Sequence, residues 1–160
     1  MYNLSKFIVI GIVFFNFACS SSVEKEAPLA VANEAVENKP EVGDELTKNV
    51  VQHHLTAFGE NNLEALMEDY TDESVVIAPD SMYVGLEQIK FLFTTMLPAF
   101  PTEGTTFSLD KMYVKNELAY ILWHAQTPAV EVPLGSDTFI VEDGKIKCQT
   151  FAAVINPIGG

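Results

Sequence analysis

Residues 106–155 read TFSLDKMYVKNELAYILWHAQTPAVEVPLGSDTFIVEDGKIKCQTFAAVI, and they are the most informative part of the sequence about its architecture. Apolar and polar residues alternate with a period of two in four segments, which are 106–114, 118–127, 130–141 and 145–155. A period of two is typical of β-strands, because successive side chains point to opposite faces. Asn116-Glu117 and Asp143-Gly144 lie at turns, and Asp-Gly suits a hairpin with positive φ. The stretch therefore predicts long antiparallel strands.

Upstream of this stretch, apolar residues recur at spacings of three and four, which is typical of helices. The first predicted helix starts at Glu45 with Asp44 as its N-cap. Its apolar stripe contains one histidine and consists of Leu46, Val50, Val51, His54, Leu55 and Phe58. Shorter helices are expected at 63–70 and 86–97, and short strands at 75–77 and 82–84. Three helices before a run of antiparallel strands predict an α+β fold, in which a strongly bent sheet wraps the helices and leaves a pocket.

The N-terminal segment is typical of an export signal. Residues 7–18 are almost wholly apolar, about 12 residues, which is too short to cross a hydrocarbon layer about 30 Å thick. Ala18 and Cys19 follow, and they resemble the lipobox of bacterial lipoproteins, although Asn16 departs from the usual leucine. The resemblance implies a signal peptide over 1–18 and an acylated Cys19. Ordinary secretory cleavage or an uncleaved N-terminal anchor remains the alternative.

The remaining boundaries follow from composition. Residues 20–43 are rich in Ser, Glu, Ala and Pro and contain no aromatic residue, so 19–43 is expected to form an acylated, disordered tether. The folded domain is expected over 44–157, with a tail at 158–160. These features predict an exported lipoprotein that is anchored to a membrane through Cys19. In a Gram-negative envelope it would lie on the periplasmic or outer-membrane side.

Charge and motif spacing exclude several classes of function. The formal net charge is −13, whereas nucleic-acid binding needs a basic face. The three histidines, two cysteines and scattered acids show no metal-ligand spacing, so no metal site is expected. No cofactor is implied. Cys148 is a lone strand thiol and is expected to be inert.

The order of several short strings resembles the SnoaL-like domains of the nuclear transport factor two-like (NTF2-like) superfamily, which includes ketosteroid isomerase. These strings are the Leu63-Glu64-Ala65-Leu66, Glu73-Ser74-Val75-Val76, Gly85-Leu86-Glu87-Gln88-Ile89, Asp137-Thr138-Phe139 and Asp143-Gly144-Lys145-Ile146 segments. The resemblance covers essentially the whole folded part. It implies a cone-shaped α+β half-barrel with a deep pocket, often dimeric through the sheet.

The resemblance to ketosteroid isomerase carries over residue by residue, and the base is missing. That enzyme uses an aspartate base with a tyrosine and a protonated aspartate as oxyanion donors, and it is one of the standard examples of pKa tuning. Ungapped matching places the base position on Ala78 and the tyrosine position on His54. The oxyanion aspartate falls near Asp137. Steroid isomerisation by the family mechanism is therefore not expected, because an alanine cannot abstract a proton.

The candidate site residues are those expected at the pocket wall: His54, Phe58, Tyr70, Phe93, Trp123, Asp137 and Phe139. His54 is either a polar group on the pocket floor or a core histidine satisfied by a neighbour such as Tyr70 or a carboxylate. Asp137 either faces the pocket or bonds its own turn. Trp123 and His124 must point to opposite faces of one strand.

Three functions remain open from the sequence. The first is an anchored domain that binds a small apolar molecule in its cone. The second is an isomerase, dehydratase or cyclase that uses His54 with Asp137, or with Asp80, as an acid–base pair. The third is a non-catalytic dimeric interaction module of the cell envelope. Apolar residues on both faces of the 118–127 strand indicate that both faces are covered, which a homodimer would provide.

Overall fold

The structure is a computed structural model that describes residues 42–158. The predicted signal peptide, Cys19 and residues 20–41 of the predicted tether lie outside the described residues, as do residues 159–160 of the predicted tail. Residues 42 and 43, which are predicted to end the tether, instead belong to the first helix. The helices are α1 (Val42–Gly59), α2 (Leu63–Glu68) and α3 (Gly85–Met96), with a 3₁₀ turn η1 (Leu97–Ala99). The strands are β1 (Val75–Ile77), β2 (Met82–Val84), β3 (Thr106–Lys115), β4 (Leu118–Gln126), β5 (Val130–Glu142) and β6 (Lys145–Pro157).

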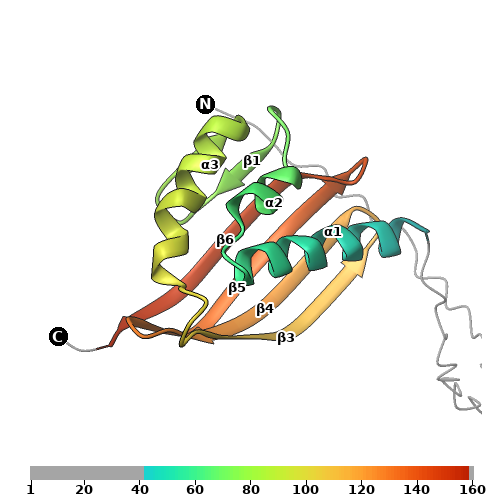
Figure 1. Ribbon diagram of the computed structural model, residues 1–160. Helices are drawn as coiled ribbons and strands as arrows, with labels where there is room; N and C mark the ends of the chain where they lie inside the picture. The colour runs from blue at the N-terminus through green and yellow to red at the C-terminus, as the bar shows by residue number, and fades with distance from the viewer. Residues whose placement is uncertain (1–41, 159–160) are drawn as a thin grey trace, which may run out of the picture. The chain divides into compact units, whose positions relative to one another are not determined.

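All six strands form one sheet in the order β2-β1-β6-β5-β4-β3. Strands β3 to β6 are antiparallel neighbours, as the alternating pattern predicts, and β1 pairs in parallel with β6. The sheet curves without closing, and the three helices lie on one of its faces (Figure 1). The expected α+β half-barrel is therefore confirmed. Asn116 and Asp143 have φ of 53° and 51°, which confirms the two tight turns.

The core lies between the helices and the concave face of the sheet. Its largest fully buried side chains come from helices and strands alike and include Val51, Leu66, Ile89, Phe93, Phe139 and Ile146. Helix α3 buries Ile89, Leu92 and Phe93, which recur at spacings of three and one. Among the described residues, no helix has the length and apolarity that a membrane crossing requires.

The start of α1 differs from the prediction. The helix begins at Val42, so Asp44 lies inside its first turn rather than at the N-cap. The Asp44 carboxylate instead accepts a hydrogen bond of 2.6 Å from the backbone N–H of Asn116, in the β3–β4 turn. A negative charge in the first turn also interacts favourably with the helix dipole. Asp44 thus ties the helix to a turn 72 residues later in the chain.

The end of α2 also differs from the prediction. The helix stops at Glu68, and Tyr70 lies beyond it. Lys145 donates to the Glu68 carbonyl at 2.6 Å, and the Ile146 N–H donates to the Asp69 carbonyl at 2.7 Å. Residues of strand β6 therefore donate hydrogen bonds to two carbonyls that would accept hydrogen bonds within the helix if it were longer. Because the helix ends before them, Asp69 and Tyr70 are buried in the interior.

Candidate functional site

A cavity of about 250 Å³ lies between the helices and the concave face of the sheet. Its wall is mainly apolar and includes seven aromatic side chains, Phe58, Tyr83, Phe93, Phe100, Phe107, Trp123 and Phe151. Asp80 and Ile155 also line it and are exposed, so the cavity reaches the surface beside them. His54, Asp137 and Gln149 are the buried polar residues on the wall.

Asp137 lies on β5 and is buried among apolar neighbours on the concave face. Its two carboxylate oxygens each accept a hydrogen bond, one from Trp123 Nε1 at 2.6 Å and one from Gln149 Nε2 at 2.8 Å. Burial raises the pKa of Asp137, and these two hydrogen bonds and the nearby His54 oppose the rise. The interpretation of Asp137 as a strand-start residue bonded to its own turn does not fit these contacts.

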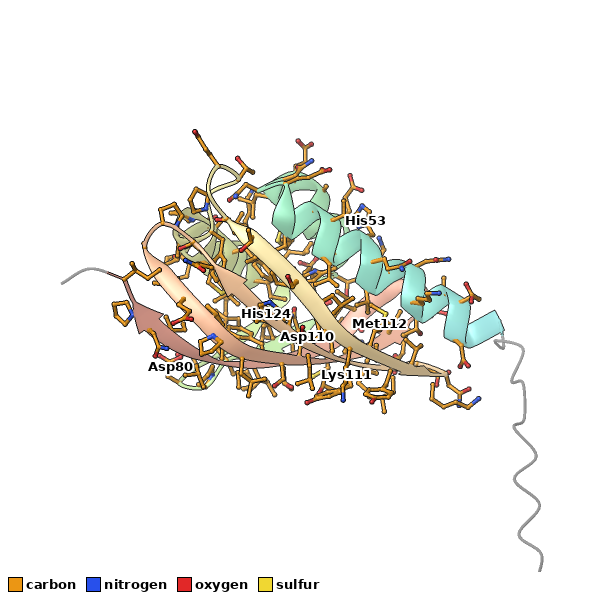
Figure 2. The ribbon with its side chains drawn as sticks, turned by 90° about the horizontal axis from the view of Figure 1, so that it is seen from below. His53, Asp80, Asp110, Lys111, Met112 and His124 are labelled. Carbon is orange, nitrogen blue, oxygen red and sulfur yellow. The ribbon has the colours of Figure 1, made fainter. Side chains whose placement is uncertain are left out.

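Trp123 lies beside the polar end of the cavity, which is the part of the wall that His54, Asp137 and Gln149 form. Its indole stacks on Phe107 with ring centroids 5.2 Å apart, and it lies opposite Gly135 in the β4–β5 ladder. His124 points to the other face of the sheet, where its Nδ1 lies 2.9 Å from Asp110 (Figure 2). The alternation in β4 therefore sends the tryptophan inward and the histidine outward, as the sequence predicts.

His54 satisfies both interpretations that the sequence left open. Its ring lines the cavity and makes edge contacts with Phe93 and Phe139. Its Nδ1 lies 3.5 Å from the Tyr70 hydroxyl and 3.6 Å from Asp69 Oδ2. His54 is thus held by polar neighbours on one edge of its ring while it forms part of the cavity wall.

Two side chains bridge His54 and Asp137, which make no direct hydrogen bond with each other among the described contacts. The Tyr70 hydroxyl donates to Gln149 Oε1, and Gln149 Nε2 donates to Asp137. Burial, together with the charges of Asp69 and Asp137, raises the pKa of Tyr70 well above its ordinary value, so its hydroxyl remains a donor at neutral pH.

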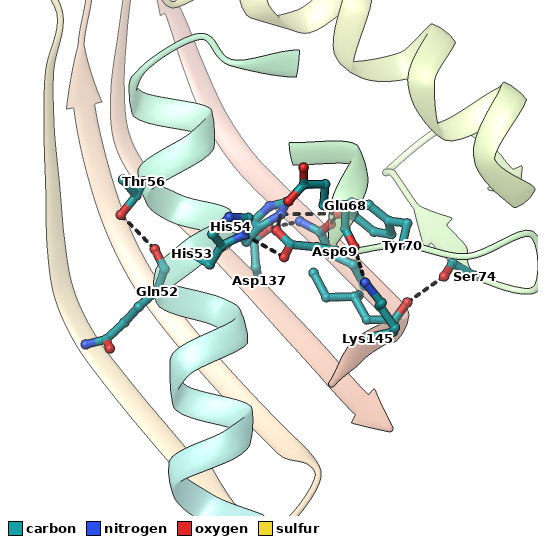
Figure 3. A network of polar contacts seen from close by, with 12 residues as sticks. Gln52, His53, His54, Thr56, Glu68, Asp69, Tyr70, Ser74, Asp137 and Lys145 are labelled. Atoms are coloured by element: carbon teal, nitrogen blue, oxygen red, sulfur yellow. Dashed lines mark hydrogen bonds and ion pairs between the residues drawn. The ribbon is translucent and has the colours of Figure 1, made fainter. Parts of the chain in front are cut away.

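Asp69 is the residue that sequence reasoning missed. Its buried carboxylate lies between two adjacent histidines of α1, with Oδ1 2.7 Å from Nδ1 of the half-exposed His53 and Oδ2 near His54 (Figure 3). Asp69 Oδ2 is buried and has no hydrogen-bond partner. In the sequence Asp69 stands beside Glu68 in an acidic stretch, and only the early end of α2 turns it inward. Gln149 was missed as well, because an amide on a strand carries no motif.

Two of the predicted pocket residues do not line the cavity. Phe139 is fully buried, and its ring centroid lies 5.4 Å from that of His54, which does line the cavity. The Tyr70 ring centroid lies 5.9 Å from that of Phe93, and the Tyr70 hydroxyl contacts His54 and Gln149. These three neighbours line the cavity, whereas Tyr70 does not. Both residues therefore pack against side chains that line the cavity and do not line it themselves.

Ala78, which the resemblance places at the base position, lies on the cavity wall. Asp80, two residues later, is exposed on the cavity rim. Among residues 42–158, no group of three or more His, Cys, Asp or Glu side chains is placed to hold a metal ion. Among the titratable side chains that line the cavity, His54 and Asp137 are the buried ones.

Comparisons with known proteins agree with this architecture. Residues 51–149 match the family model described as SnoaL-like domain. No curated protein matches the chain in sequence. Among solved structures, an NTF2-like protein of unknown function from Mesorhizobium loti is 21% identical, with a TM-score of 0.61 over 72% of this chain and 96% of that chain.

Two further structures carry provisional enzyme names. A protein from Shewanella denitrificans, provisionally named a SnoaL-like polyketide cyclase, is 16% identical with a TM-score of 0.54, over 68% of this chain and 90% of that one. A protein from Kribbella flavida, provisionally named a ketosteroid isomerase, is 12% identical with a TM-score of 0.60, over 73% and 85% respectively. At these identities the likeness concerns the fold.

Proposed function

The chain belongs to the SnoaL-like domain family, and on that premise we propose that its cavity binds a small apolar molecule. The observation that carries the proposal is the cavity itself, about 250 Å³ in volume and walled mainly by aromatic and aliphatic side chains. Small-molecule sites are typically concave, largely apolar and equipped with a few convergent polar groups. Here these groups are His54, Asp137 and Gln149.

The volume limits the size of the ligand. A buried apolar cavity of about 150 Å³ binds benzene, so a cavity of about 250 Å³ suits one or two rings. A four-ring steroid is too large to lie wholly inside it. The alanine at position 78 also supports a ligand other than the substrate of ketosteroid isomerase.

Thermal-shift measurements with one-ring and two-ring aromatic compounds test this proposal. A bound compound raises the melting temperature, because a ligand at 100 times its Kd stabilises the folded state by about 2.7 kcal/mol. Ala153→Phe fills the cavity and should abolish the shift. Ala152→Phe, on the opposite face of β6, is the matched control and should keep it. The proposal fails if no compound raises the melting temperature, or if both variants keep the shift.

A second candidate function is acid–base catalysis of an isomerase, dehydratase or cyclase type. It is supported by Asp137, whose pKa burial raises toward the range that suits proton transfer, and by the carboxylate of Asp69 beside His54. If it holds, His54→Ala and Asp137→Asn abolish turnover of an enone or polyketide-like substrate, while circular dichroism shows the folded state. Unchanged turnover in both variants would exclude this pair.

A third candidate function uses the other face of the sheet. Large apolar side chains are exposed there on all six strands, and they include Ile77, Met82, Tyr113, Leu118, Leu134 and Val154. Soluble monomers rarely expose large apolar patches. It supports association of two copies through their sheets, which light scattering of the purified protein measures.

The anchor remains a proposal. The apolar segment 7–18 and the following Cys19 support export and acylation, which would hold the domain at a membrane in the cell envelope. Metabolic labelling with a fatty acid should mark the wild-type protein and leave Cys19→Ser unlabelled. Labelling of the Cys19→Ser variant would contradict acylation at this residue.

A further inference from the structure

The polar end of the cavity has a definite order of donors and acceptors, which starts at Tyr70. The Tyr70 hydroxyl has one hydrogen, and it donates this hydrogen to Gln149 Oε1. Towards His54 Nδ1, 3.5 Å away, the hydroxyl therefore offers only a lone pair. Gln149 is oriented in the same direction, because its Nε2 donates to Asp137.

The tautomer of His54 follows from this order. Both groups beside Nδ1 are acceptors, the Tyr70 hydroxyl oxygen and Asp69 Oδ2, and Asp69 Oδ2 is otherwise unpartnered in the interior. In a neutral imidazole the nitrogen between two acceptors carries the hydrogen, and the other nitrogen is then an acceptor. His54 Nε2 therefore has a lone pair. It has no hydrogen-bond partner in the described part of the chain, and the ring lines the cavity.

Asp137 contributes a second acceptor. Trp123 and Gln149 aim one N–H at each of its oxygens, an arrangement that suits a carboxylate. Each oxygen keeps further acceptor capacity, and the residue lines the cavity with His54. The Trp123 indole N–H and the Tyr70 hydroxyl are already committed as donors, which leaves the second amide hydrogen of Gln149 as the donor of this network.

From this geometry we infer that the cavity selects a hydrogen-bond donor: a one-ring or two-ring apolar molecule with an O–H or N–H group that donates to His54 Nε2 or to Asp137. This inference rests on the proposed ligand-binding function and names its ligand class. Asp69 acts as a positioning residue, since it holds the His54 hydrogen on Nδ1 and so turns the lone pair of Nε2 into the cavity.

Matched ligand pairs test the inference by isothermal titration of the purified protein. 2-Naphthol should bind at least about tenfold more tightly than 2-methoxynaphthalene, and indole at least about tenfold more tightly than 1-methylindole, because the methylated compounds have lost the donor. The first pair examines an O–H donor and the second an N–H donor. A preference in either pair supports the inference and identifies the donor type.

Two variants on α1 locate the acceptor. His54→Phe removes both ring nitrogens and should reduce the preference for 2-naphthol by several-fold, leaving the share that Asp137 accepts. Gln52→Phe changes an exposed residue of the same helix, which does not line the cavity, and should leave the preference unchanged. An unchanged preference in His54→Phe would remove His54 from the acceptor pair.

The tautomer is measured without any ligand. Nitrogen-15 NMR of the imidazole rings at neutral pH should show a protonated Nδ1 and an unprotonated Nε2 for His54. The chain has three histidines, and the spectrum of His54→Phe assigns the signal. A protonated Nε2 overturns the inference even if the protein binds aromatic compounds.

The outcomes separate this inference from the proposed function. Equal binding of each compound and its methylated partner overturns donor selection while the cavity remains a binding site. Tighter binding of the ketone 2-acetylnaphthalene than of 2-naphthol would assign the site to the second amide hydrogen of Gln149, and would also overturn the inference. If no compound binds, the proposed function fails, and the NMR measurement still decides the acceptor.

Discussion

Gly135 faces Trp123 across the β4–β5 ladder so closely that a Cβ on Gly135 would lie 2.2 Å from Trp123 Cε2. The indole therefore lies flat over the backbone of β5. In this position its Nε1 reaches the carboxylate of Asp137, 2.6 Å away and two residues further along the strand. The missing side chain at Gly135 thus allows the position of the Trp123 indole, which forms part of the cavity wall. No sequence motif surrounds this glycine.

Gly135→Ala should displace the indole and break its hydrogen bond to Asp137. Overpacking and the loss of a hydrogen bond to a buried charge together predict a decrease of about 2–4 kcal/mol in the free energy of unfolding. Urea unfolding measures it through the fluorescence of the single tryptophan. Gly59→Ala is the matched control, because nothing lies within 4 Å of its added Cβ. Equal stability of the two variants would mean that the indole moves aside at no cost.

Asp137 predicts a pH dependence of stability. Burial raises its pKa in the folded protein, so the folded state binds this proton more tightly than the unfolded state does. The stabilisation that Asp137 gives the folded state is therefore fully present below its ordinary pKa of 3.8. This stabilisation is lost as the pH rises through the pKa that Asp137 has in the folded protein. The difference in unfolding free energy between wild type and Asp137→Asn should fall across this window, by at most about 1.4 kcal/mol per pH unit. A difference that rises with pH would show that the folded protein favours the carboxylate.

Tyr70→Phe should destabilise the fold through the polar network rather than through packing. It leaves Gln149 Oε1 and His54 Nδ1 without their shared hydroxyl in the interior, which predicts a loss of about 1–3 kcal/mol. Tyr113→Phe removes a hydroxyl from an exposed side chain on the outer face and should change stability by less than about 0.5 kcal/mol. Chemical denaturation of both variants gives the comparison.

Leu118→Lys tests association through the outer face of the sheet. Leu118 is exposed on β4 within that apolar face, and a lysine there would place two like charges near each other or bury them in a sheet-to-sheet dimer. Light scattering should show a dimer for the wild type and a monomer for the variant. Gln52→Lys adds the same single positive charge on an exposed residue of α1 and should leave the dimer intact. A monomeric wild type would remove this candidate function.

Much of the fold was predictable because its signals are local. The alternation over residues 106–155 and the Asp143-Gly144 turn specify the hairpins, since the side-chain period and positive φ are properties of neighbouring residues. The end of α2 was not predictable in this way. Two bonds from β6, to the carbonyls of Glu68 and Asp69, end the helix, and they join residues 77 positions apart.

The candidate site also has a part that local sequence patterns predict and a part that they do not. The apolar stripe of α1 places His54 inward, and strand alternation places Trp123 and Asp137 on the concave face. The sequence by itself therefore determines the α+β class, the antiparallel ladders and the inward faces, because periodicity and turn chemistry act within a few residues. It also determines that Ala78 stands at the base position of the resembling enzyme.

Tertiary structure alone decides how those inward groups meet. Asp69 reaches His54 because a helix ends early, Gln149 links Tyr70 to Asp137 across the interior, and Gly135 admits the indole of Trp123. These contacts join distant segments, and their geometry is set by the curvature of the sheet and the packing of the core. A periodic pattern in the sequence gives no information about distances between remote segments. The arrangement of the polar end of the cavity therefore follows only from the tertiary structure.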